Sequence, residues 1–267
     1  IRSGQGVWLE DIDGKRYLDA VSSWWTNLFG HSEPRIAAAI SKQAQTLEHV
    51  MFAGFSHQPG LELAEKLIAL SPAGLSRVFY ADNGSAAVEI ALKMSFQYFA
   101  NQGMHKKNRF MALHNSYHGE TLGALSMADI PLYRDIYSPL LLKPLFAPSP
   151  DSFTKQEGET DRQCALRCAG ELEALVERHQ HELCALIIEP LVQCAGGMRM
   201  YHPVYLEQAR KICTQYGIHL IADEIAVGFG RTGTLFACEQ AGISPDFICL
   251  SKGLTGGFLP MSAVLTT

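Results

Sequence analysis

Two short apolar runs, each followed by a charged side chain, constrain the fold of this chain more than any other feature. Residues 219–222 lead into Asp223, and residues 246–250 lead, one residue later, into Lys252. Continuous apolar runs bounded by turn residues are typical of strands that are covered on both faces of a parallel sheet. Ligands bind at the carboxyl ends of such strands. The sequence therefore predicts that Asp223 and Lys252 lie at one ligand-binding edge.

The chemistry of this pair narrows the type of site. An amine can form a Schiff base with an aldehyde cofactor, and a carboxylate can keep a pyridine nitrogen protonated. The pairing of Asp223 with Lys252 is therefore the central hypothesis for what the chain does.

Composition favours a globular small-molecule enzyme. The 267 residues are 47% hydrophobic and 18% charged, with a net charge of -5, which is ordinary for a globular protein with a sizeable core. No apolar run approaches the roughly 18 residues of a membrane helix, and net acidity argues against nucleic acid as a partner. The seven cysteines have no CxxC spacing, which favours reduced, buried thiols over a metal site. We expect a cytoplasmic protein with neither a membrane nor a metal partner.

Strand and helix patterns alternate along the chain. After a hairpin at residues 6–20, whose turn is Asp13-Gly14, helices are predicted at 36–49, 61–70, 86–99, 164–179 and 203–216. Strands are predicted at 77–80, 109–113, 184–188, 219–222 and 246–250. This alternation predicts a doubly wound α/β sheet. An apolar strand at 261–267 would leave an edge and a face uncovered, so we expect further chain on both sides.

Two loops at predicted strand ends could contact a ligand. Residues 81–85 form a small-residue turn that opens a helix, where backbone N–H groups suit a phosphate, although Ser and Asn are also plain helix caps. Tyr117 follows the strand at 109–113 and could cover a planar ring, or pack ordinarily. His118 could equally be a satisfied loop histidine.

These residues carry a resemblance to a known family. The chain resembles the class III pyridoxal-phosphate-dependent aminotransferases of fold type I, through Asn83-Gly84-Ser85, Tyr117-His118-Gly119, Glu189-Pro190, Asp223-Glu224-Ile225, residues 228–233 and Ser251-Lys252. The resemblance implies an α/β fold with a mostly parallel central sheet flanked by helices. It assigns residues 1–50 to a smaller α+β domain and the active-site entrance, and residues 51–267 to the cofactor-binding large domain. A C-terminal part of the small domain would lie outside this chain.

The resemblance also implies roles for single residues. Lys252 would hold pyridoxal 5'-phosphate covalently and carry protons, and Asp223 would pair with the pyridine nitrogen. Tyr117 would stack on one ring face and Ile225 on the other. The phosphate would be bound by Gly84 and Ser85.

Within the family, four segments favour one subgroup. Residues 22–25, 49–52, 196–203 and 252–257 are similar to enzymes that move an amino group from S-adenosyl-L-methionine to 8-amino-7-oxononanoate, giving 7,8-diaminononanoate for biotin. Ala86 and Ala226 replace polar residues of many other members. The alternatives are another omega-amino acid or diamine:pyruvate aminotransferase, an aminomutase or racemase on the same fold, and a cofactor-free binding protein.

Three further residues are candidates for substrate contact. Trp24 and Trp25 offer aromatic faces that attract cations and cover methylene chains, and core packing is their alternative. Arg231 could bind a carboxylate or position a pocket loop, or form an ion pair within the subunit. By resemblance, the active sites would be shared between the subunits of a homodimer.

Overall fold

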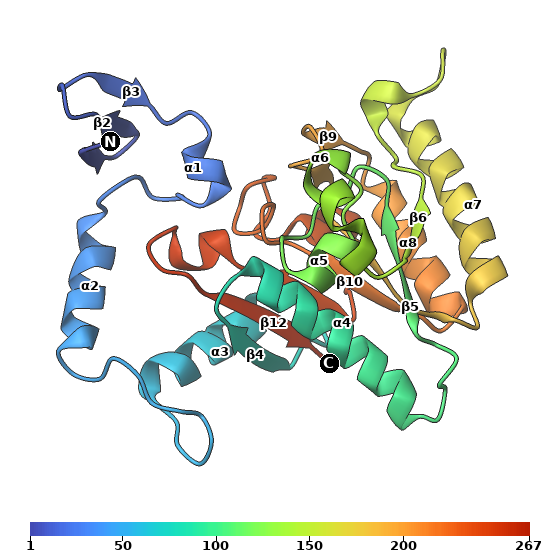
Figure 1. Ribbon diagram of the computed structural model, residues 1–267, viewed down its shortest axis with the longest axis horizontal. Coiled ribbons are helices and arrows are strands. Elements are labelled where there is room, and N and C mark those ends of the chain that lie inside the picture. Colours follow the sequence, from blue (N-terminus) through green and yellow to red (C-terminus); the bar gives the residue numbers. More distant parts are fainter.

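A seven-stranded sheet forms the centre of the computed structural model, which describes residues 1–267 (Figure 1). In spatial order its strands are β4 (Arg77–Ala81), β12 (Ser262–Thr266), β11 (Phe247–Leu250), β10 (His219–Asp223), β7 (Leu183–Ile188), β5 (Arg109–Leu113) and β6 (Leu145–Ala147). Strand β12 alone runs antiparallel to its neighbours. The predicted α/β class with a mostly parallel sheet is confirmed.

Strand β12 lies inside the sheet and not at its edge. Its backbone pairs with β11 on one side and with β4 on the other, and Ala263, Val264 and Leu265 are fully buried. The expectation that this strand would leave an edge and a face uncovered is therefore wrong. Local apolar pattern does not reveal which strands flank a given one, because the partners are distant in sequence.

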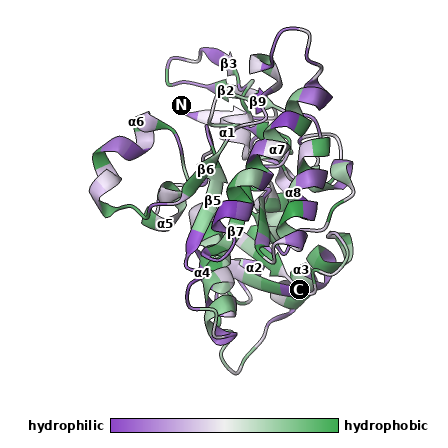
Figure 2. Cartoon of the chain, turned by 90° about the vertical axis from the view of Figure 1, so that its right-hand side faces the viewer, coloured by the Kyte–Doolittle hydropathy of each residue, from purple (hydrophilic) through white to green (hydrophobic).

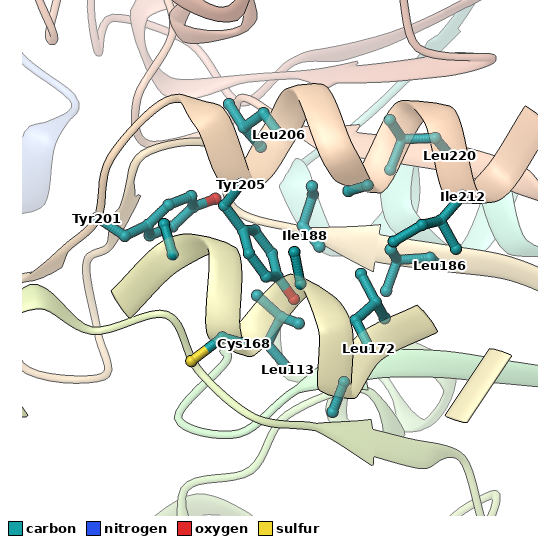
Figure 3. Packing of buried hydrophobic residues seen from close by; sticks show 14 of the residues in the cluster. Leu113, Cys168, Leu172, Leu186, Ile188, Tyr201, Tyr205, Leu206, Ile212 and Leu220 are labelled. Carbon is teal, nitrogen blue, oxygen red and sulfur yellow. The ribbon is translucent and has the colours of Figure 1, made fainter. Parts of the chain in front are cut away.

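The two faces of the sheet bury alternate residues of each strand. Along β7, Leu186 and Ile188 pack with helices α7 (Asp161–His179) and α8 (Val204–Gln215), as Figure 3 shows. The intervening Ile187 packs on the other face with α4 (Gly84–Asn101). Both faces are covered, which explains why the central strands are mostly hydrophobic, as Figure 2 shows for β5 and β7.

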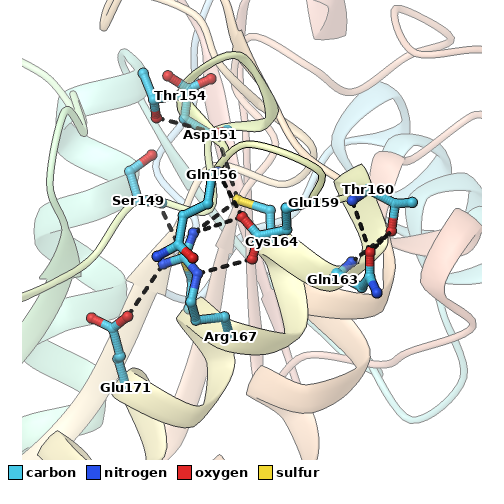
Figure 4. Close-up of polar contacts among 11 residues, drawn as sticks. Ser149, Asp151, Thr154, Gln156, Glu159, Thr160, Gln163, Cys164, Arg167 and Glu171 are labelled. Carbon is cyan, nitrogen blue, oxygen red and sulfur yellow. Dashed lines mark hydrogen bonds and ion pairs between the residues drawn. The ribbon is translucent and has the colours of Figure 1, made fainter.

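The long helices begin at recognisable signals. Thr160 and Gln163 form a reciprocal capping box at the start of α7. In the same region, Arg167 pairs with Glu159 at 2.9 Å and with Glu171 at 3.3 Å (Figure 4). Together these contacts fasten the loop before α7 to the first turns of the helix.

The predicted helices are all present. Helix α2 (Pro34–Ala44) is shorter than predicted; just beyond its end, the Leu47 carbonyl accepts a hydrogen bond from the Gln43 side chain at 2.8 Å. The remaining helices are α1 (Ser22–Trp25), α3 (Gln58–Leu70), α5 (Leu122–Ser126) and α6 (Pro131–Arg134), with 3₁₀ turns η1 (Asp135–Leu140), η2 (Ser152–Thr154), η3 (Ala237–Ala241) and η4 (Lys252–Thr255). None of the helices combines the length and apolar character that a membrane crossing requires.

The N-terminal segment stands to one side of the central sheet (Figure 1). Its antiparallel strands β1 (Ser3–Gln5), β2 (Trp8–Glu10) and β3 (Arg16–Leu18) confirm the predicted hairpin and add a third strand. A second small ribbon pairs β8 (Val192–Gln193) with β9 (Arg199–Met200). The domain boundary at residue 50 stays a prediction.

Candidate active site

The carboxyl ends of the central strands open onto a cavity of about 780 Å³. Loops after β4, β5, β7, β10 and β11 line it, together with the segment that contains α1. The predicted site residues that line this one cavity are Trp24, Trp25, Gly84, Ser85, Tyr117, Asp223, Ile225 and Lys252. Arg231 is the one predicted site residue that does not line it.

Asp223 and Lys252 reach the cavity from neighbouring strands. Asp223 is the last residue of β10, and Lys252 begins the turn after β11, to which β10 is paired in parallel. Burial lowers the pKa of the Lys252 amine, and the negative charge of Asp223 acts in the opposite direction. A lysine with a lowered pKa has more of the neutral form that attacks an aldehyde.

His118 holds the Asp223 carboxylate. The two side chains are buried, and His118 Nδ1 lies 2.7 Å from Asp223 Oδ2. The other carboxylate oxygen accepts the Ile225 N–H at 3.1 Å. His118 Nε2 has no hydrogen-bond partner. The interpretation as a satisfied loop histidine is thus only half right, since one ring nitrogen orients the acid of the site.

The N-terminus of α4 faces the cavity with small residues. Asn83 Oδ1 accepts the Ala86 N–H at 3.0 Å, so the plain capping interpretation holds for Asn83. Gly84 and Ser85 follow it and line the cavity. The N–H groups of a first helical turn have no partner within the helix, which leaves them available to an anion.

Gly119 allows the loop after β5 to meet the start of α4. Ser85 Oγ accepts the Glu120 N–H at 3.0 Å. Gly119 has a φ of +128°, and a Cβ there would lie 2.1 Å from Ser85 Oγ. Only glycine fits such a backbone so close to another side chain. The loop after β5 is therefore fitted closely against the start of α4.

Tyr117 is fixed at both ends of its side chain and at its backbone. Its ring lies edge-on to Tyr133, with 5.4 Å between centroids, and its hydroxyl donates to Glu120 Oε1 at 2.7 Å. Its backbone N–H donates to Glu189 Oε1 at 3.0 Å. Ordinary packing does not require these three constraints together, so the surroundings of Tyr117 favour a defined surface toward the cavity.

Glu189 is a buried acid behind this surface, and the sequence indicated it only as part of a motif. Its second oxygen accepts the Cys194 N–H at 3.0 Å, and the Tyr201 hydroxyl donates to its backbone carbonyl at 2.6 Å. Burial raises the pKa of the Glu189 carboxyl to about 7. A charged residue at the end of a wholly apolar strand was the sequence signal that could have revealed it.

The tryptophan pair forms one wall of the cavity. Trp24 is 71% exposed, and the ring centroid of Trp25 lies 4.8 Å from Lys252 Nζ. Arg231 donates to the Trp25 carbonyl at 3.5 Å and makes no ion pair with a carboxylate of this chain. Of the alternatives for Arg231, positioning of a pocket loop agrees best with this contact.

Comparison with known proteins accounts for this arrangement. The class-III aminotransferase family matches residues 1–267. The chain belongs to this family. Class III aminotransferases depend on pyridoxal 5'-phosphate, and this bears out the resemblance carried by the motifs.

Individual relatives are similar over the whole chain. It is 48% identical to adenosylmethionine-8-amino-7-oxononanoate aminotransferase of Nitratidesulfovibrio vulgaris and 49% identical to that of Helicobacter pylori, each over 100% of the chain. The crystal structure of an omega transaminase from Pseudomonas jessenii in complex with PMP superposes with a TM-score of 0.95 at 34% identity, covering 100% of the chain and 59% of that structure. The chain spans 50% and 59% of the lengths of the two sequence relatives.

Proposed function

We propose that this class III aminotransferase chain moves an amino group from S-adenosyl-L-methionine to 8-amino-7-oxononanoate, giving 7,8-diaminononanoate in biotin biosynthesis. The observation that carries the proposal is the convergence of Lys252, Asp223 and the start of α4 on one cavity. The names of the relatives at 48% and 49% identity supply the substrates.

The residues present fit pyridoxal 5'-phosphate. Gly84 and Ser85 would hold the phosphate at the start of α4, where Gly119 leaves room for the loops to close together. Tyr117 and Ile225 would cover the two faces of the ring. When bound, the cofactor supplies an aldehyde for the amine and an electron sink for the carbanion.

Lys252 and Asp223 would perform the central steps. The Lys252 amine would hold the cofactor, then take the proton from the substrate's amino-bearing carbon and deliver it to the cofactor carbon that the amine had held. Burial lowers its pKa, which favours this role as a base. Asp223, oriented by His118 at 2.7 Å, would keep a proton on the ring nitrogen.

The tryptophan wall suits two dissimilar substrates. A sulfonium cation is attracted to an aromatic face, and an aliphatic chain is covered by it. We assign Trp24 and Trp25 to substrate contact, and Arg231 to the carboxylate end of a substrate or to the position of the loop at Trp25. We further propose a cytoplasmic homodimer with shared active sites. The seven free cysteines support a reducing location.

One rival activity has an observation of its own. The omega transaminase from Pseudomonas jessenii superposes at a TM-score of 0.95, so an omega-amino acid or diamine:pyruvate aminotransferase remains the second candidate. The two differ in amino donor. Purified holoenzyme should lose its cofactor absorbance on mixing with S-adenosyl-L-methionine alone. Loss only with omega-amino acids or diamines would replace the proposal with its rival.

Borohydride reduction followed by peptide mass spectrometry tests the cofactor site separately. The label should be found on Lys252. Lys107 is the matched control, because burial lowers its pKa too while its amine donates to the carbonyls of Leu183 and Gly217. A label on Lys107, or none at all, would contradict the assignment.

A further inference from the structure

The segment that carries the tryptophan pair has an unusual backbone. Ser22, Ser23, Trp24 and Trp25 have φ values of 50°, 47°, 59° and 64°, and Ser23 and Trp24 have ψ values of 56° and 50°. These are left-handed helical conformations, which cost free energy at every residue other than glycine. A run of four without a glycine persists only if the surroundings hold it.

The carboxylate of Asp19 holds this left-handed turn. Its Oδ1 accepts the Ser23 N–H at 3.0 Å, and its Oδ2 accepts the Ser23 hydroxyl at 2.7 Å. The same Oδ2 lies 2.9 Å from His31 Nε2. The Asp19 side chain is only 6% exposed, so these three partners take the place of water.

His31 in turn is fixed to the N-terminal sheet. Asn27 donates its Nδ2 hydrogen to His31 Nδ1 at 3.0 Å, which leaves the ring hydrogen on Nε2, facing Asp19. The backbone of His31 exchanges hydrogen bonds with Gly6 at 3.0 and 2.7 Å. Asp19 therefore connects the left-handed turn, through His31, to the backbone of the N-terminal sheet.

The turn brings its aromatic side chains to the cavity. Trp24 and Trp25 line it, and the Trp25 ring lies 4.8 Å from the Lys252 amine. On the other side, a Cβ at Gly257 would lie 3.0 Å from the Thr26 carbonyl oxygen. A shift of the turn would therefore displace an aromatic wall of the cavity.

We propose that Asp19 is a positioning residue that sets substrate affinity by holding this strained turn, and with it both tryptophans, against the cavity. The inference rests on the proposed function for its substrates. It assigns Asp19 no contact with substrate. The competing explanation is that Asp19 merely stabilises the N-terminal sheet.

Asp11 provides a matched control for that explanation. In the turn between β2 and β3, it accepts the same number of hydrogen bonds, from the Asp13 N–H, the Lys15 N–H and the Tyr17 hydroxyl at 3.0, 2.9 and 2.8 Å. It does not line the cavity. Loss of Asp11 should loosen the sheet without moving the tryptophans.

The test compares holoenzymes carrying Asp19→Ala, Asp19→Asn and Asp11→Ala. Asp19→Ala should raise the KM of both substrates roughly tenfold or more while kcat changes less than about threefold, since the wall binds ground and transition states alike. Asp11→Ala should leave KM within about twofold. If Asp19→Ala does not fold, Asp19→Asn decides, because its amide oxygen can still accept the Ser23 N–H; it should give an intermediate KM.

A readout independent of activity follows the tryptophans directly. Of the three tryptophans in this 267-residue chain, only Trp24 and Trp25 remain in a Trp8→Phe background, so near-ultraviolet circular dichroism and acrylamide quenching of this chain report on the turn. Both signals should change in Asp19→Ala and stay unchanged in Asp11→Ala. Unchanged KM and unchanged tryptophan signals in Asp19→Ala, with the cofactor still bound, would overturn the proposal.

A glycine substitution in the turn tests whether Asp19 acts by holding the strained backbone or only by stabilising the fold. Ser22 has a φ of 50°, and its hydroxyl has no hydrogen-bond partner in this structure. Ser22→Gly should partly restore KM in Asp19→Ala, because glycine adopts this backbone without penalty. Ser41→Gly in the right-handed helix α2 is the control and should not restore it. Absence of cofactor on Lys252 in the unmodified protein would refute the proposed function instead.

Discussion

Replacing Glu189 by glutamine should stabilise the cofactor-free protein at pH 8 and weaken cofactor binding. Burial raises the pKa of this carboxyl from 4.5 to about 7. Folding therefore favours the protonated acid, so this contribution to stability is complete below pH 4.5 and is lost as the pH rises through about 7. The interval between the two pKa values corresponds to about 3 kcal/mol in the free energy of unfolding.

Glutamine should remove that loss. It is never charged, has nearly the same volume, and its amide oxygen accepts hydrogen bonds while its amide NH2 group donates them. The free energy of unfolding of Glu189→Gln should exceed that of the unmodified protein by up to about 3 kcal/mol at pH 8. The difference should close as the pH falls to 4.5.

Cofactor affinity should move in the opposite direction. Glu189 accepts two backbone N–H groups, from Tyr117 and Cys194, both at 3.0 Å. The amide nitrogen of glutamine cannot accept either, so one loop must shift. If that loop carries Tyr117, the ring surface shifts as well, and cofactor affinity should fall roughly tenfold.

Urea unfolding of the cofactor-free protein from pH 4.5 to 8 measures the first effect, and cofactor titration measures the second. Glu224→Gln is the matched variant: Glu224 is buried, accepts the Ala237 and Cys238 N–H groups at 2.8 Å, and also has a pKa raised to about 7. It should be stabilised with the same pH dependence and keep its cofactor affinity. A Glu189→Gln protein that is less stable by the same margin at every pH would refute the reasoning, because the two N–H bonds would then outweigh the cost of burying charge.

Three other substitutions test the site. Lys252→Ala should abolish amino transfer without changing the far-ultraviolet circular dichroism spectrum; measurable turnover would contradict its role. Asp223→Asn should lower the transfer rate at least roughly 100-fold. The pH above which the free enzyme captures the cofactor should also fall, because the Asp223 charge raises the Lys252 pKa and its removal leaves only the lowering by burial. A rise in that pH would refute this. Gly119→Ala would place a Cβ 2.1 Å from Ser85 Oγ and should weaken binding of pyridoxal phosphate more than binding of pyridoxal. Fluorescence titration measures both affinities. Equal weakening would show that the substitution does not act at the phosphate site.

The sequence predicted the elements better than their arrangement. The apolar runs before Asp223 and Lys252 are the strands β10 and β11, which lie in one sheet as predicted; their direct parallel pairing is a finding of the structure. The place of β12 between β4 and β11 could not be predicted, because strand pairing depends on contacts between distant segments. The direction of β12 was equally hidden, since a fully buried strand shows the same apolar run in either orientation.

Site residues could be predicted from the sequence where a reactive residue type closely follows a predicted strand. Lys252 and Asp223 follow apolar strands, and both reach the cavity. The contact between His118 and Asp223 at 2.7 Å has no local signal, because 105 residues separate the two. The left-handed turn at Trp24 was missed for another reason: the usual sequence signal for positive φ is glycine, and the turn has none.

Part of the backbone strain lies at the cavity, and this bears on how the site keeps its shape. Ser23, Trp24, Trp25 and Lys252 have positive φ values and line the cavity, each at a cost of about 1–2 kcal/mol. The buried strands behind them have no such residue. An unstrained sheet thus supports cavity-lining residues whose backbone conformation the local sequence alone would not adopt. Because these cavity-lining residues are held by side-chain contacts such as those of Asp19, weakening one contact should displace the cavity wall before it unfolds the sheet.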